Sequence, residues 1–229
     1  MSDIVKRGIA VADANIVFIA FFSVANFLMW FAFARIRSHV AGPAEPSDAE
    51  LLKRLASLYL LLVSVPVGAL MDALFGALLR KQLLSAEPDS DVSMLAWVRR
   101  FYFRMLLLSA VQGVAYVLAY YLEFPFDYIL YVPLRYAAAF VVWQDCSVRK
   151  AIAGTSGFLS AHSGKFFPVW FVGMTFLIFA DLVGLTPAAG NPVFTGLVHI
   201  VYTYFDLALM ATALVFFLRL QPKRQEVLA

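Results

Sequence analysis

Four charged side chains lie inside long apolar stretches of this sequence: Asp72, Arg135, Asp181 and Asp206. An arginine at the centre of a bilayer costs about 2.5–3.5 kcal/mol on insertion scales, and it rarely occurs there without an acidic partner or a water-filled cavity. Carboxylates beside a guanidinium in lipid can form structural ion pairs, or they can bind and release protons or ions along a transport path. The sequence therefore offers two kinds of chemistry for these residues and leaves both open.

The composition indicates that the chain resides in lipid. Of its 229 residues, 62% are hydrophobic and 14% are charged, whereas an ordinary soluble domain has about 25% charged residues. The formal net charge of +3 comes mainly from lysines and arginines beside the ends of apolar stretches, where such cations set topology and contact anionic headgroups. We expect a single transmembrane domain over residues 1–229, located in a membrane and, more specifically, in a bacterial inner membrane. Nucleic-acid binding is not expected.

Apolar stretches long enough to cross a hydrocarbon core of about 30 Å predict an all-α bundle of about six transmembrane helices. The predicted spans cover residues 14–34, 55–79, 101–122, 126–145, 166–186 and 193–218. Asp13 is expected to cap the first span. As an alternative, a break at Pro66 and Gly68 would divide the second stretch into two spans. The polar segment 146–165 is expected to be a loop or a helix on the membrane surface.

The distribution of lysine and arginine predicts which helix ends face the cytoplasm. With both termini inside, most of the cations fall on the inner side, namely Lys6, Arg7, Arg80, Lys81, Arg99, Arg100, Arg149, Lys150, Lys165, Arg219, Lys223 and Arg224. The outer side holds Arg35, Arg37, Lys53 and Arg54, all beside or in the first outer connection. Because cytoplasmic connections carry the excess of cations, we expect both termini to be cytoplasmic, although this outer group opposes the trend.

Counting about 1.5 Å per residue from the predicted helix ends places the charged side chains at two depths. Arg135, Asp181 and Asp206 fall about 9–18 Å below the outer surface, so either acid could reach the guanidinium. Asp72 falls about 10 Å from the inner surface, near the depth of Arg104. The sequence therefore predicts an outer cluster around the arginine and a separate inner pair of Asp72 and Arg104.

Polar side chains recur at steps of three and four residues in the same stretches, which places them on shared helix faces. The third predicted span carries Gln112 and Tyr116 on one stripe, and the sixth carries His199 two turns before its aspartate. In the fourth span, Tyr131 shares the face of Arg135. The predicted polar cavity consists of Arg135, Asp206, Asp181, Gln112, Tyr116 and His199.

No motif in the sequence specifies a catalytic or metal site. The three histidines, His39, His162 and His199, fall on two connections and one apolar stretch, so they lack the arrangement of haem or metal ligands. With a single cysteine, Cys146, the chain cannot form an internal disulfide or a CxxC site. An intramembrane enzyme is therefore the least favoured class, with no catalytic residue assigned, and cofactor binding is undetermined.

Two classes of function fit these observations. The first is a small ion-coupled or proton-coupled transporter or channel, in which protonation of an acid accompanies movement. The second is a non-catalytic structural or assembly subunit of a larger membrane complex. Such a subunit would present an apolar face to partner membrane subunits or to another copy of the chain, whereas a transporter would hold water near its buried charges. Both classes place the chain in contact with the lipid bilayer.

Overall fold

The computed structural model describes residues 2–40, 58–83, 92–122, 126–184 and 191–220. Within these ranges the regular structure is entirely helical, which confirms the predicted all-α class for them. The helical elements are α1 (Ser2–Asp13), α2 (Ile16–Val40), a π-helical turn η1 (Leu60–Ser64), α4 (Val65–Leu83), α5 (Met94–Leu122), α6 (Phe126–Gln144), α7 (Val148–Ala161), α8 (Ser163–Gly184) and α9 (Pro192–Leu220).

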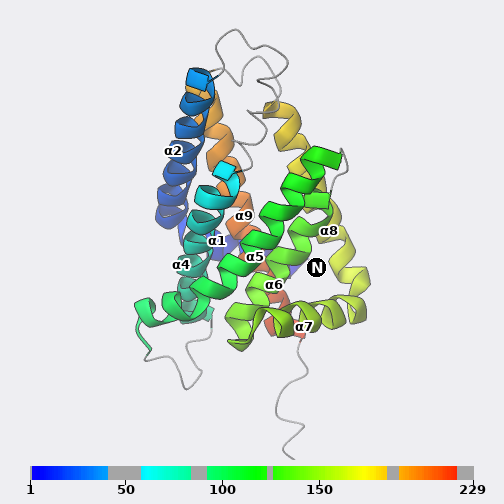
Figure 1. Ribbon diagram of the computed structural model, residues 1–229. Coiled ribbons are helices and arrows are strands. Elements are labelled where there is room, and N and C mark those ends of the chain that lie inside the picture. Colours follow the sequence, from blue (N-terminus) through cyan, green and yellow to red (C-terminus); the bar gives the residue numbers. More distant parts are fainter. Residues whose placement is uncertain (1, 41–57, 84–91, 123–125, 185–190, 221–229) are drawn as a thin grey trace, which may run out of the picture.

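Helix α6 is the central helix of the bundle. It packs against α4, α5, α7, α8 and α9, and α7 lies across the lower end of the bundle (Figure 1). Buried aromatic rings fill the same end, where Tyr136 of α6 makes edge-to-face contacts with Phe166, Phe216 and Phe217. Because α6 carries Arg135 near its middle, the fold brings that guanidinium into the interior of the bundle.

Three helical segments in the described part of the chain are long and apolar enough to cross a membrane: Leu61–Leu83, Met94–Ala119 and Gly196–Leu220. A fourth crossing results if Asp3–Asp13 and Ile16–Ala25, which meet at an angle of 72°, form one broken span. Helix α8 has a shorter apolar part, Ser163–Phe179, among the residues whose side chains are described. The described residues thus include three helices, or four with the broken pair, that could span a membrane, and six spans remains a prediction.

The second predicted span is continuous where the structure describes it. From Leu60 to Leu83 the helix passes through Pro66 and Gly68 without a break, so the alternative of two spans divided at these residues is wrong. Proline lacks a backbone N–H and would disrupt the interior of a regular α-helix. Here Pro66 is the second residue of α4, directly after the π-helical turn, where the hydrogen-bond pattern is already changing. The part of the predicted span before residue 58 lies outside the described ranges.

The sequence missed α1, which precedes the first predicted span. Its buried residues Ile4, Gly8 and Ala12 recur every four residues and form one face. This face packs on α9, where a Cβ atom added to Gly8 would lie 2.6 Å from the Cα atom of Thr212. Glycine at this position therefore allows the two backbones to approach closely.

The junction between α1 and α2 differs from the predicted helix cap at Asp13. Asp13 ends α1, and its carboxylate accepts a hydrogen bond of 2.6 Å from the hydroxyl of Tyr204. The bend itself is held by Asn15, which is buried and exchanges two side-chain hydrogen bonds of 2.9 Å with Gln82 at the end of α4. Asn15 also donates to the carbonyl of Val11 at 2.7 Å. The start of α2 is thereby fixed to both α1 and α4.

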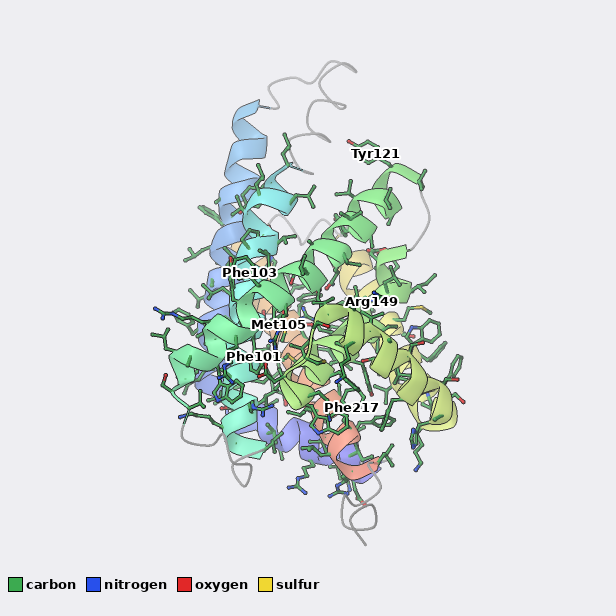
Figure 2. The ribbon with its side chains drawn as sticks, turned by 60° about the horizontal axis from the view of Figure 1, so that its bottom comes forward. Phe101, Phe103, Met105, Tyr121, Arg149 and Phe217 are labelled. Carbon is green, nitrogen blue, oxygen red and sulfur yellow. The ribbon has the colours of Figure 1, made fainter. Side chains whose placement is uncertain are left out.

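The polar segment after α6, predicted as a loop or a surface helix, forms helix α7. Ser147 caps it by accepting a hydrogen bond of 3.4 Å from the backbone N–H of Lys150. Ala151, Thr155 and Leu159 form its buried face, whereas Arg149 and Lys150 are exposed. Figure 2 turns this end of the molecule forward, so that α7 with Arg149 lies in front of the bundle.

Candidate functional site

Arg135 binds two carboxylates from two different helices. Its Nη1 atom donates to Oδ2 of Asp72 on α4 at 2.6 Å, and its Nε atom lies 2.6 Å from Oδ1 of Asp206 on α9. The side chains of Arg135, Asp72 and Asp206 are only 13%, 8% and 12% exposed. The Nε–H group is buried and has no hydrogen-bond partner in the described part of the chain, so its contact with Asp206 is an ion pair only.

Tyr131 completes this group, which we call the Arg135 cluster: Arg135, Asp72, Asp206 and Tyr131. It lies one helical turn before Arg135 on α6 and is 1% exposed. Its hydroxyl donates a hydrogen bond to Oδ1 of Asp206, and the guanidinium carbon of Arg135 lies 5.6 Å from the centre of its ring. A cation at this distance from an aromatic face is attracted to it. Tyr131 therefore holds both members of the Arg135–Asp206 pair.

Small side chains allow α4, α6 and α9 to approach around the cluster. Ala69, Ala73 and Gly76 lie within four residues of Asp72, and each is buried. A Cβ atom added to Gly76 would lie 2.7 Å from Cγ2 of Val142 on α6, closer than real Cβ contacts occur. Small residues at these steps are typical of tightly packed membrane helices. This close packing leaves little room for solvent around the charged side chains, which explains their low exposure.

The Arg135 cluster contains one permanent positive charge and two carboxylates. With both carboxylates ionised its net charge is −1, and with one protonated its net charge is zero. An unbalanced charge is expensive in an apolar interior, where the charges attract strongly but have lost their hydration. The arrangement is therefore suited to bind and release one proton, or to balance its extra charge with one monovalent cation.

The structure brings together Arg135 and Asp206, as the sequence suggested, but it gives Asp72 a different partner from the predicted one. Asp72 pairs with Arg135, while Nη1 of Arg104 pairs with Asp145 directly after α6. The correction has a geometric reason. Counting from residue 79, the end of the predicted span, places Asp72 too close to the inner surface. Helix α4 continues to Leu83, so Asp72 lies 11 residues before its end and Arg135 lies 9 residues before the end of α6. At about 1.5 Å per residue the two side chains are nearly level.

The structure places Gln112, Tyr116 and His199 outside the four residues of the Arg135 cluster. Gln112 is partly buried and Tyr116 is 49% exposed, both on α5. His199 lies on α9 with its ring edge against Phe27 of α2, the ring centres being 6.4 Å apart. Asp181 belongs to α8, but its side chain lies outside those the structure describes.

Sequence reasoning missed the role of Asp145 and assigned none to the hydroxyl of Tyr131. Asp145 ends an apolar stretch, and in the fold it lies beside the arginine-rich start of α5. This contact can be recognised only once α5 is known to pack against α6. Within the described ranges, no three His, Cys, Asp or Glu side chains gather closely enough to hold a metal ion. Comparisons of the chain with models of protein families, with curated protein sequences and with solved structures find no match.

Tyr131→Phe is expected to destabilise the protein by about 1.5–3 kcal/mol, because it removes a buried hydrogen bond to a charged group. Tyr136→Phe provides the matched control on the same helix. Tyr136 is fully buried, and its hydroxyl has no hydrogen-bond partner in the described part of the chain, so its removal should cost little or stabilise the fold. Unfolding of both variants in the same detergent measures the difference. Equal losses in the two variants would contradict the assigned role of Tyr131.

Proposed function

We propose that this protein spans a bacterial inner membrane with six helices and couples proton binding at the Arg135 cluster to the transport of an ion or small solute. The apolar helices support the membrane location. The long helices run lengthwise and alternate in direction, with the start of α5 and α8 and the end of α4, α6 and α9 at the end where α7 lies (Figure 1). The cation-rich end containing Arg99, Arg149 and Lys165 is proposed to be cytoplasmic.

The observation that carries the proposal is the excess carboxylate beside Arg135. Asp72 and Asp206 belong to different helices and share one guanidinium. Protonation of Asp206 weakens its attraction to Arg135, whereas the pair of Arg135 with Asp72 keeps its full charge. A proton at this position therefore changes how strongly α9 is held to α6, and a change in helix packing is what a proton-coupled transporter requires.

Proton flux into reconstituted vesicles tests this function. Wild-type protein in vesicles loaded with a pH-sensitive dye is expected to carry protons when a pH gradient and a membrane potential are imposed. Asp206→Asn is expected to reduce the flux to that of protein-free vesicles, because an amide cannot take up the proton. Asp13→Asn is the matched control, since Asp13 also accepts a hydrogen bond from a tyrosine but lies outside the cluster. It should leave the flux unchanged.

A second candidate function is a structural subunit of a membrane complex. The burial of the Arg135 cluster favours it. All three charged side chains are at most 13% exposed, as expected of ion pairs that fix helices α4, α6 and α9 in register. The same vesicles separate the two candidates. Absence of flux in the wild-type protein across the pH range, with co-purification of a constant protein partner, would replace the transporter proposal by the structural one.

A further inference from the structure

Exposed side chains on two helices change from cationic to apolar at the same end of the bundle. On α5, Arg99 and Arg100 are exposed and are followed on the outer surface by Phe103 and Leu107, which are 71% and 57% exposed. On α8, exposed Lys165 is followed by Phe167, which is 59% exposed. Such a change is typical of the level at which a helix passes from the headgroup region into hydrocarbon.

Helix α7 lies across the bundle at this end (Figure 1) and joins the end of α6 to the start of α8. Its buried face packs inward, and its first turn exposes Arg149 and Lys150. A helix with one buried face and a cationic exposed turn, lying across membrane-spanning helices, is suited to the headgroup level. The three helices α5, α7 and α8 thus define one plane of cations around the lower end of the molecule.

Within this plane, two arginines share one carboxylate beside a buried tryptophan. Nη1 of Arg104 pairs with Oδ1 of Asp145, and Nη1 of Arg100 lies 3.5 Å from its Oδ2. The guanidinium carbon of Arg100 lies 5.0 Å from the centre of the Trp97 ring. Asp145 has a φ angle of 46°, in the left-handed region, where the chain turns from α6 into α7. This turn places the Asp145 carboxylate beside Arg100 and Arg104.

Lys150 lies in the first turn of α7, five residues after Asp145, and its backbone N–H donates to Oγ of Ser147. Burial raises the pKa of the Cys146 thiol, and the positive charges of Lys150 and Arg104 oppose that shift, which agrees with their placement at this corner. We call Arg100, Arg104, Lys150 and Asp145 the cationic corner. It holds three positive charges and one negative charge, and Arg100 is 47% exposed at its outer side. The corner therefore has the charge to receive one or two further negative charges from outside the protein.

We propose that the cationic corner binds the phosphate of an anionic phospholipid headgroup, with Arg100 and Lys150 as its direct ligands. Guanidinium groups bind phosphate oxygens through paired N–H donors, and an ammonium group adds a mobile point charge. The position of the corner, at the level where exposed Phe103 and Leu107 follow Arg99 and Arg100 on α5, favours a lipid headgroup over a soluble anion. The inference rests on the proposed membrane location and is independent of proton transport.

Lipid binding to the purified protein in detergent, measured by native mass spectrometry during titration, tests this site. The probes are phosphatidylglycerol and phosphatidylcholine. The wild-type protein is expected to retain phosphatidylglycerol preferentially. The double variant Arg100→Gln/Lys150→Gln should bind it about 30-fold more weakly, since each cation at a headgroup contributes roughly five-fold. Lys6→Gln/Arg7→Gln removes two exposed cations from α1, and it should keep the wild-type affinity.

Three results would overturn the proposal. Equal retention of both lipids by the wild-type protein would show that no anionic headgroup is selected. Equal weakening in the two double variants would assign the effect to net charge alone. Full displacement of phosphatidylglycerol by millimolar inorganic phosphate would assign the corner to a free anion. Circular dichroism of both variants verifies that each is folded. Because this experiment measures lipid binding and not proton flux, it remains a valid test of the lipid site even if the transport proposal is wrong.

Discussion

Replacing Arg135 by glutamine is expected to destabilise the protein by about 3–5 kcal/mol, the cost of breaking a buried ion pair by removal of one partner. The substitution leaves Asp72 and Asp206 facing each other in an apolar interior without their counter-charge. Because glutamine can still form hydrogen bonds, the loss of stability measures the effect of removing the positive charge. Denaturant unfolding in detergent, followed by circular dichroism, measures the free energy of unfolding.

The single variants Asp72→Asn and Asp206→Asn provide the controls for this prediction. Each leaves one guanidinium with one carboxylate, so each should lose clearly less stability than Arg135→Gln. The triple variant that combines all three substitutions removes every charge from the cluster and should recover part of the loss, as uncharged replacements of buried ion pairs do. If Arg135→Gln were as stable as either single asparagine variant, the unbalanced charge would not dominate the energetics of the cluster.

Gly8→Ala is expected to detach α1 from α9. The added Cβ atom would lie 2.1 Å from Oγ1 and 2.6 Å from Cα of Thr212. A side chain can rotate away from such a clash, but the backbone atom cannot, so the helices must separate. Overpacking of this kind costs about 1–3 kcal/mol. Hydrogen exchange of the α1 amides should become faster, while exchange in α5 and α6 stays unchanged.

Gly157→Ala is the matched control, because an added Cβ atom on Gly157 in α7 meets nothing within 4 Å. Alanine is a better helix former than glycine by about 0.5–1 kcal/mol, so this variant should be as stable as the wild-type protein or slightly more stable. Unchanged exchange of the α1 amides in Gly8→Ala would show that α1 does not depend on this close approach.

The sequence predicted the helical elements well where hydropathy alone determines them. The stretches that became α5, α6, α8 and α9 are mostly apolar, and their observed bounds fall within a few residues of the predicted ones, apart from the start of α5. Helix α1 was missed because it is short and alternates charged and apolar residues, so its stability depends on α9 rather than on its own composition. Asp13 was predicted to be a helix cap because its hydrogen bond with Tyr204 also depends on the packing of α1 against α9.

The candidate site was predictable only in part. Arg135 and Asp206 stand out because charge is costly in an apolar helix, but which aspartate meets the arginine depends on helix ends and packing. Counting the depth of Asp72 from residue 79, the end of the predicted span and four residues before the end of α4, gave it a wrong depth and a wrong partner. Asp145 could not be assigned from spacing, because its contact with Arg104 depends on how far α5 extends past the end of α6.

The bend between α1 and α2 has a consequence for how the molecule can respond to its surroundings. Asn15 and Gln82 join it through two amide groups, each donating to the other. Amides carry no charge and do not titrate, so this joint is insensitive to pH and only weakly affected by salt. The Arg135 cluster and the cationic corner both depend on charge. Acidification or a change in membrane surface charge would therefore act on α6, α7 and α9, while the joint between Asn15 and Gln82 keeps the start of α2 and the end of α4 together.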